Sequence, residues 1–273
     1  MTLELDTRQR AMLQEMGVRV WLPGTALAPI APLVTLVPLQ IQASAPAVFS
    51  APPPSPPSPR PSAAVPTRTV DASALDWSAL VQAASSCQAC GLCAGRKNTT
   101  LQAQSLQNDW MVVGDPPDDD EDRTGQPFAG APGLLLDNML KAVGASRNSV
   151  KNGVDNGAAQ GVYATNIVKC RPPQGRIPRS EELAQCTAYL QREIALVQPK
   201  VILAMGRFAM QVLLSEHGDA AMQPLGKLRG TVYRYQGVPV VVTYAPKVLL
   251  RASADKGKAW ADLCLAMDVL VAA

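Results

Sequence analysis

Four cysteines, arranged as two widely separated pairs, are the first residues whose type and spacing suggest chemistry. Cys87 and Cys90 form a Cys-x2-Cys motif, and Cys170 and Cys186 follow much later in the chain. Four thiolates can bind a tetrahedral zinc ion, and they can equally bind a [4Fe–4S] cluster. The spacing alone does not separate zinc from iron, and Cys93 could replace Cys90 as a ligand. The alternative for each cysteine is a buried thiol that packs as a small apolar residue.

Three polar loops carry the other side chains that could do chemistry. The first is Gly114–Gly130 (GDPPDDDEDRTGQPFAG), the second is Thr165–Pro173 (TNIVKCRPP), and the third is Thr243–Arg251 (TYAPKVLLR). Carboxylates can position water, an amide can hydrogen-bond a ligand, and basic groups can contact phosphates. These loops are therefore the candidate site.

The elements that must position these loops alternate between apolar runs and helical patterns. The runs fit buried strands at Trp110–Gly114, Val162–Val168, Val201–Gly206 and Val238–Tyr244. The helical patterns lie at Gly133–Val143, Glu181–Val197 (with Ser180 as the predicted N-cap), Arg207–Ser215 and Ala254–Val271. This alternation predicts an α/β fold with a mainly parallel sheet that helices cover on both faces. Ligands bind beyond the carboxyl ends of such strands, which is where the three loops begin.

The first 70 residues differ in composition from the rest of the chain. Residues 1–22 contain a short helical pattern, which is either a frayed terminus or a docking helix for a protein partner. Residues 23–70 form a Pro/Ala-rich linker with nine prolines between Pro46 and Pro66, which favours an extended tether. Three prolines interrupt its apolar part, Gly24–Gln42, so we predict no membrane span. Residues 71–273 are the predicted folded domain.

The overall composition limits the class of protein. Of the 273 residues, 47% are apolar and 17% are charged, which excludes a fully disordered chain and a coiled coil. A net charge of +3 does not by itself indicate a nucleic-acid partner, and 4% aromatic residues argue against an extended base-stacking platform. No secretory signal opens the chain, so we expect a reducing cytoplasm, where clustered cysteines indicate metal. Cys264, within an apolar helical stripe, is expected to be a packing residue.

The three loops, in this order and with Cys87-x2-Cys90 upstream, resemble the family 4 uracil-DNA glycosylases, which carry an iron–sulfur cluster. The TNIVKCRPP segment is the most specific part, and the resemblance extends from about Ser86 to the C-terminus. It implies a three-layer α/β/α sandwich and hydrolysis of the N-glycosidic bond of a uracil flipped out of DNA. It also implies a [4Fe–4S] cluster on Cys87, Cys90, Cys170 and Cys186 that holds loops near the DNA.

The same resemblance assigns roles to four residues of the first two loops. Asn166 would bind the base, since its amide can donate to uracil O4 and accept from N3–H, and Phe128 would stack on the base. Asp115, where the family has Glu, and Glu121 are the candidate catalytic carboxylates near the sugar and the water. The alternatives are a turn-stabilising Asn, a core Phe and a solvated acidic turn over residues 118–122.

Basic residues of the later loops are the candidate DNA contacts. Lys169, Arg171 and Arg251 are expected to contact phosphates, and Arg176 and Arg229 are further candidates. The alternative is that these scattered charges are simply solvated. Uracil-containing DNA is the expected partner, and the chain is expected to act as a monomer.

Two departures from the family pattern bear on activity. Ala245 stands where the family has the His of a His-Pro motif, and that His donates to uracil O2 as negative charge develops on the base. Pro116 replaces a Gly and has no N–H to donate. Loss of one such donor costs about 10²–10³ in rate. A weakened glycosylase is therefore the leading hypothesis, and a non-catalytic DNA- or damage-binding iron–sulfur module is the alternative.

Overall fold

The computed structural model describes residues 71–102, 108–147 and 160–272. The predicted N-terminal helix (1–22), the linker (23–70) and the apolar run Gly24–Gln42 lie outside the described residues. Among the described helices, none combines the length and apolarity that a membrane crossing requires.

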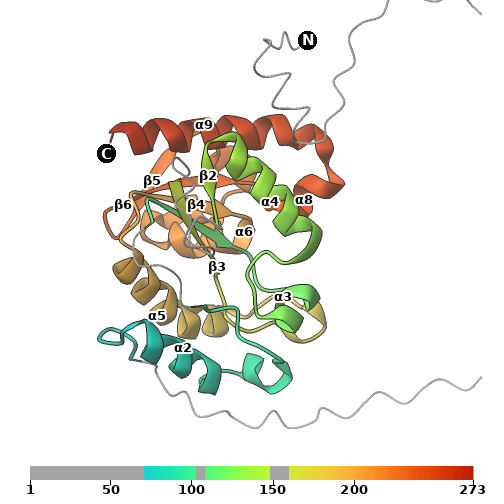
Figure 1. Cartoon of the computed structure of the whole chain (residues 1–273), viewed down its shortest axis with the longest axis vertical. Coiled ribbons are helices and arrows are strands. Elements are labelled where there is room, and N and C mark those ends of the chain that lie inside the picture. Colours follow the sequence, from blue (N-terminus) through green and yellow to red (C-terminus); the bar gives the residue numbers. More distant parts are fainter. Residues whose placement is uncertain (1–70, 103–107, 148–159, 273) are drawn as a thin grey trace, which may run out of the picture. The chain divides into compact units, whose positions relative to one another are not determined.

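A six-stranded sheet forms the centre of the fold, with the strand order β2-β3-β1-β4-β6-β5 (Figure 1). Neighbouring strands are parallel except for β5, which runs antiparallel to β6 at one edge. The strands are β1 (Trp110–Gly114), β2 (Ala145–Ser146), β3 (Gln160–Asn166), β4 (Val201–Met205), β5 (Val232–Tyr235) and β6 (Val238–Thr243). The predicted, mainly parallel sheet is confirmed.

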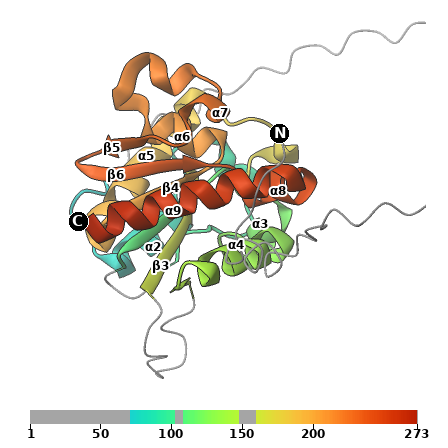
Figure 2. The same cartoon turned by 90° about the horizontal axis from the view of Figure 1, so that it is seen from above.

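Helices cover both faces of this sheet, which confirms the three-layer α/β/α sandwich. In Figure 1, α4, α8 and α9 lie above the sheet and α2 and α5 lie below it, and Figure 2 shows α9 running across the strands. The α-helices are α2 (Trp77–Ser86), α3 (Asp119–Thr124), α4 (Gly130–Ala142), α5 (Ser180–Val197), α6 (Arg207–Leu213), α7 (Leu225–Leu228), α8 (Pro246–Arg251) and α9 (Lys256–Ala272). The 3-10 turns are η1 (Gly91–Gly95), η2 (Pro173–Gly175), η3 (Ser215–Met222) and η4 (Ser253–Asp255).

Successive side chains of each central strand enter two different cores. In β1, Met111 and Val113 pack with α2, α5 and α6, whereas Trp110 and Val112 pack with α4 and α9. All five residues of β1 are buried, as are all five of β4. A parallel sheet buried on both faces needs apolar side chains at every position, which is why the strands are visible as continuous apolar runs in the sequence.

The strand ends lie in one row across the sheet. Gly114 of β1 pairs with Asn166 of β3 on one side and with Met205 of β4 on the other, and Met205 pairs with Thr243 of β6. The loops that follow Gly114, Asn166 and Thr243 therefore leave the sheet side by side.

Two local predictions are corrected. Strand β3 ends at Asn166 rather than at Val168: the bond from the Ile167 N–H to the Gly114 carbonyl (2.9 Å) is the last one to β1, which itself ends at Gly114, and the next residues form bends. Ser180 is the first residue of α5 rather than its N-cap, since Arg179 occupies the cap and its N–H donates to Glu182 Oε2 (2.8 Å). The strands β2 and β5 and the helices α2, α3, α7 and α8 were not predicted.

Candidate functional site

The three candidate loops meet in one cleft at the carboxyl ends of the strands. The cleft spans about 300 Å³ including its open side. Its lining includes Asp115, Pro116 and Phe128 from the segment that follows β1, Asn166 at the end of β3, and Ala245 and Lys247 at the start of α8. The sequence analysis assigned roles to Asp115, Phe128 and Asn166 and named Pro116 and Ala245 as departures from the family pattern, and the structure brings all five together. Lys247 lies in the third candidate loop, and the sequence analysis did not single it out.

Asn166 holds its amide in a fixed orientation. Its Nδ2 group donates to the Asp115 carbonyl (2.9 Å) and to Glu121 Oε1 (3.0 Å), and both of these partners are acceptors. The nitrogen must therefore face them, and the amide oxygen must face the other way. Asn166 Oδ1 is buried and accepts no hydrogen bond from a described residue. An unpaired buried acceptor costs about 1–3 kcal/mol, so a ligand N–H at this atom would be favoured.

Glu121 is the carboxylate that holds the first loop in place. Its Oε1 accepts from the Phe128 N–H (2.6 Å) and from Asn166, and its Oε2 accepts from the Asp118 N–H (2.8 Å). Burial is the main cause that raises the pKa of Glu121, while these hydrogen bonds oppose the rise. Both oxygens accept hydrogen bonds from the protein, so Glu121 orients Asn166 and Phe128 while it also lines the cleft.

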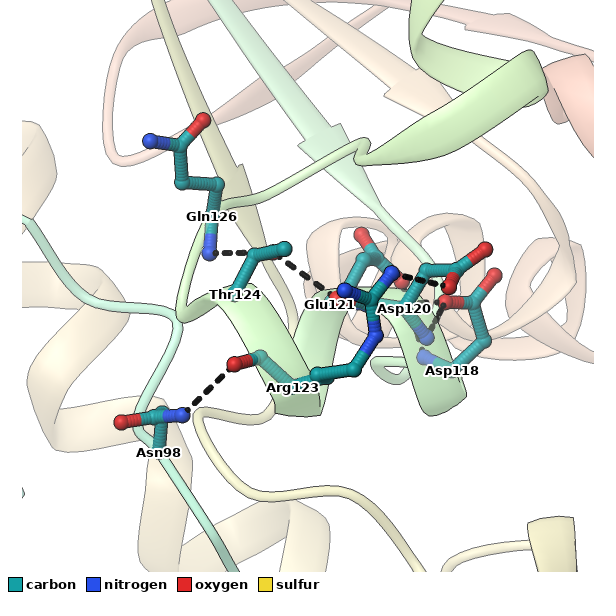
Figure 3. A network of polar contacts seen from close by, with 7 residues as sticks. All are labelled: Asn98, Asp118, Asp120, Glu121, Arg123, Thr124 and Gln126. Carbon is teal, nitrogen blue, oxygen red and sulfur yellow. Dashed lines mark hydrogen bonds and ion pairs between the residues drawn. The ribbon is translucent and has the colours of Figure 1, made fainter.

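The acidic run 118–122 is a capped helical turn rather than a wholly solvated loop. Figure 3 shows Asp118 accepting from the N–H groups of Asp120 and Glu121, each at 3.1 Å. Arg123 pairs with Asp120 (2.8 Å), and Asn98 Nδ2 donates to the Arg123 carbonyl (3.0 Å). Acidic side chains in a first helical turn interact favourably with the helix dipole, which explains their concentration here.

Phe128 covers the end of strand β1. Its side chain is 8% exposed and lines the cleft, and its backbone has a positive φ of 53°. A Cβ atom on Gly114 would lie 2.5 Å from the Phe128 ring Cζ. Glycine at 114 is therefore required for the ring to occupy this place.

Asp115 is held at the start of α6. Its Oδ1 accepts from the Phe208 N–H (2.8 Å) and more weakly from the Ala209 N–H (3.4 Å). Burial raises the pKa of Asp115, whereas the charge of Lys247 and these two N–H groups lower it. Its Oδ2 accepts no hydrogen bond from a described residue, so one carboxylate oxygen remains for water or substrate.

Cys87, Cys90, Cys170 and Cys186 lie in or against one core cluster and are called the cysteine group below. Cys93 lies beside them, since its N–H donates to the Cys90 carbonyl (3.4 Å), so its role as an alternative ligand stays a prediction. None of the chain's cysteines forms a disulfide. Burial raises the pKa of Cys170 to about 11, with Cys90 and Cys87 adding to the rise, and burial raises the pKa of Cys186 to about 12, with Cys170 and Cys90 adding to it. Cys170 and Cys186 belong to the same buried core cluster, and Cys87 and Cys90 pack against it. In the described part of the chain, however, no three Cys, His, Asp or Glu side chains converge tightly enough for a single metal ion.

Arg96 contacts two members of the cysteine group, Cys87 and Cys170. The sequence analysis did not predict this contact. Arg96 Nη1 donates to Cys170 Sγ (3.3 Å) and to the Cys87 carbonyl (3.3 Å), and its Nη2 donates to the Ser85 carbonyl (2.5 Å). A guanidinium next to a thiol favours the thiolate form that metals bind. Its position three residues after Cys93 is the only sequence signal for this role.

Lys169 lies inside the protein, which differs from the expected phosphate contact. Its side chain is 2% exposed, and Nζ donates to Glu193 Oε2 (2.5 Å), to the Asn166 carbonyl (2.7 Å) and to Thr165 Oγ1 (2.8 Å). Glu193 also accepts from the Tyr163 hydroxyl (2.7 Å) and from Thr165. Glu193 on the apolar stripe of α5 was the available signal, because a buried carboxylate requires a partner.

The other basic candidates are placed differently from one another. Arg171 pairs with the exposed Asp119 (2.7 Å), and Arg176 makes two contacts with Glu182 (2.6 and 2.8 Å). Arg229 pairs with the buried Asp262 (2.7 Å). The side chain of Arg251, at the end of α8, is exposed. Arg171 and Arg251 are thus the expected phosphate contacts whose placement remains compatible with that role.

Comparison with known proteins identifies what the chain is similar to. The family model described as the uracil DNA glycosylase superfamily matches residues 102–264. The type-4 uracil-DNA glycosylase of Pyrobaculum aerophilum is 34% identical over 190 residues, which covers 68% of this chain and 90% of that relative. The type-4 enzyme of Archaeoglobus fulgidus is 33% identical over 175 residues, covering 63% and 81%. That of Sulfurisphaera tokodaii is 34% identical over 170 residues, covering 60% and 71%.

Proposed function

Because the chain belongs to the uracil-DNA glycosylase superfamily, we propose that it hydrolyses the N-glycosidic bond of a uracil flipped out of DNA. The observation that carries this proposal is the buried, unpartnered Oδ1 of Asn166 beside the cleft. An acceptor in this position matches the N3–H of uracil. Cytosine presents a lone pair at N3, so two acceptors would face each other and binding would be penalised.

The proposal assigns Asn166 one contact with the base rather than two. Both hydrogens of its Nδ2 group are already donated, to the Asp115 carbonyl and to Glu121. The O4 contact expected from the resemblance would require breaking one of these bonds. Discrimination in this chain therefore rests on Oδ1 and on the shape of the cleft.

The remaining cleft residues divide into positioning and reacting groups. Phe128 offers its ring to the flipped base, which removes the base from water. Asp115 places one free carboxylate oxygen near the sugar, where it can orient a water molecule and stabilise positive charge on C1′. Glu121 orients Asn166 and Phe128.

The cysteine group fits the [4Fe–4S] cluster that the type-4 relatives and the sequence resemblance imply. All four donors are thiols, Cys170 and Cys186 are buried in one core cluster against which Cys87 and Cys90 pack, and Arg96 donates to Cys170 Sγ. Burial disfavours their thiolate forms, so a cationic centre is needed to hold them ionised. When bound, the cluster would cross-link α2, the segment after β3, and α5. Cys170 lies four residues after Asn166, so this cross-link would fix the loop that carries the base contact.

Two residues reduce the expected rate. Ala245 is buried at the start of α8 and offers no side-chain donor to the cleft, and Pro116 offers no N–H. Ala245 also favours a second candidate function, a non-catalytic module that binds uracil-containing DNA through the same fold. Arg171 and Arg251 would contact phosphates in either case, which would give a salt-dependent affinity.

A single-turnover excision assay tests the proposal. Purified protein in excess is mixed with oligonucleotides that contain one deoxyuridine or, as the control, one deoxycytidine. We expect slow release of uracil and no release of cytosine, and we expect Asn166→Ala to abolish uracil release while DNA affinity changes little. Retained DNA binding with no uracil release from single- or double-stranded DNA would establish the non-catalytic module instead.

A further inference from the structure

The charges that line the cleft are unevenly distributed. Among its described lining residues, Asp115, Asp118 and Glu121 are acidic, and Lys247 is the single basic residue. The leaving base carries negative charge as the glycosidic bond breaks, so three carboxylates would oppose that charge. A positive group is needed on this side of the cleft.

The wall around residue 245 lacks hydrogen-bond donors. Ala245 presents a methyl group, and Pro116 and Pro246, which also line the cleft, have no backbone N–H. The two prolines offer no donor to an anion, and the Ala245 side chain offers none either. The next residue along α8 is Lys247.

The Lys247 side chain is placed to take part. It is exposed, it lines the cleft in the first turn of α8, and it takes part in none of the ion pairs found among the described residues. Its charge nevertheless acts on Asp115, where it is the largest of the influences that lower the pKa. A flexible four-carbon stem carries this ammonium group, so it can adjust to a bound base.

Resting on the function proposed above, we infer that Lys247 contacts the departing uracil and stabilises its developing negative charge, in place of a donor at residue 245. As the C1′–N1 bond breaks, its electron pair passes to the base. Water adds to C1′ and releases a proton, which neutralises the base after it has left. Lys247 keeps its own proton throughout and acts by charge and hydrogen bonding. Lys247 is therefore a catalytic residue, and it does the work that the family assigns to a His at the position of Ala245.

The experiment must separate this role from a contact with a DNA phosphate. Lys247→Met removes the charge and keeps the length, and Lys247→Arg keeps the charge. Lys200→Met is the matched control, because Lys200 is an exposed lysine that pairs with Asp109 (3.0 Å) at the opposite end of the strands. Single-turnover rates at saturating DNA and dissociation constants for the same DNA are measured for all four proteins.

We expect Lys247→Met to slow uracil release by about 10- to 100-fold at saturating DNA, with little change in the dissociation constant. Lys247→Arg should recover most of the rate, and Lys200→Met should match the wild type. Ala245→His should rescue Lys247→Met more strongly than it accelerates the wild type, since His and Lys247 would supply the same stabilisation. A weaker dissociation constant with an unchanged rate would instead assign Lys247 to a phosphate and overturn the inference.

A second substrate gives a readout that a structural role would not move. 5-Fluorouracil leaves more easily than uracil because fluorine withdraws charge from the ring. Lys247→Met should therefore slow release of 5-fluorouracil less than release of uracil, and equal slowing would refute the role. If the wild type excises uracil and Lys247→Met excises it equally fast, only this inference is overturned. A wild type that excises neither base overturns the proposed function and the inference together.

Discussion

Replacement of Lys169 by Met should be among the most destabilising single changes in this protein. Lys169 and Glu193 form an ion pair that is almost fully buried, with side-chain exposures of 2% and 0%. Lys169→Met leaves the Glu193 carboxylate in the core with only the hydroxyl groups of Tyr163 and Thr165 as donors. The lost partner is a charge, and hydroxyl groups do not replace it.

The expected magnitude follows from the burial of the pair. Removing one partner of a buried ion pair typically costs about 3–5 kcal/mol, because the remaining charge is uncompensated. For a domain of this size each kcal/mol lowers Tm by roughly 2–4 °C, which gives a decrease of about 6–20 °C. Chemical denaturation followed by circular dichroism measures the free energy directly, and calorimetry measures Tm.

Two further variants make the prediction falsifiable. The double variant Lys169→Met/Glu193→Gln removes both charges and should recover at least half of the lost stability. Lys200→Met breaks an exposed pair with Asp109 and should cost less than about 1 kcal/mol. If Lys169→Met costs no more than Lys200→Met, the buried pair does not contribute as the contacts indicate. Lys169 also donates to the Asn166 carbonyl, so uracil release should fall in the single variant.

Three other predictions follow from separate contacts. Gly114→Ala should displace the Phe128 ring, which would lower the rate of uracil release while Tm changes little. A lower Tm with an unchanged rate of release would mean that the ring is only a core residue. Arg176 lowers the pKa of Glu182 below its ordinary value of 4.5, so the contact contributes its full stabilisation above about pH 4.5. This contribution is lost as the pH falls through the lower pKa that Glu182 has in the folded protein. In acid unfolding titrations, Arg176→Gln should therefore lose less stability over this pH range than the wild type. Serine at any member of the cysteine group should remove iron and sulfide on elemental analysis, while Cys264→Ser should retain both, and one zinc with no iron would refute the cluster.

The sequence by itself determined the architecture, and it predicted the edge of the sheet at which the candidate site lies. Strands such as β1 and β4 are buried on both faces, so every residue must be apolar, and the pattern is visible without any tertiary information. The carboxyl ends of parallel strands share one edge, which placed the loops after β1, β3 and β6 together. The motif residues Asp115, Phe128 and Asn166 accordingly line one cleft.

Only the tertiary structure decided what each polar side chain does. Lys169 and Arg171 lie two residues apart and carry the same charge, yet one is buried against Glu193 and the other reaches the exposed Asp119. A simple alternation of side chains does not explain the difference, since Val168, Lys169 and Cys170 are all buried; it comes from the partners that α5 and α3 bring to each residue. A sequence shows which charges exist, but their partners come from elements far along the chain.

The same reason separates the two acidic candidates. Glu121 and Asp115 look equivalent in the sequence, as carboxylates in one loop. In the folded protein, Glu121 has both oxygens bound to its own loop and to Asn166, whereas Asp115 keeps one oxygen free. The identity of a residue fixes the chemistry available to it, and the hydrogen bonds that it has already made decide how much of that chemistry is left for a substrate.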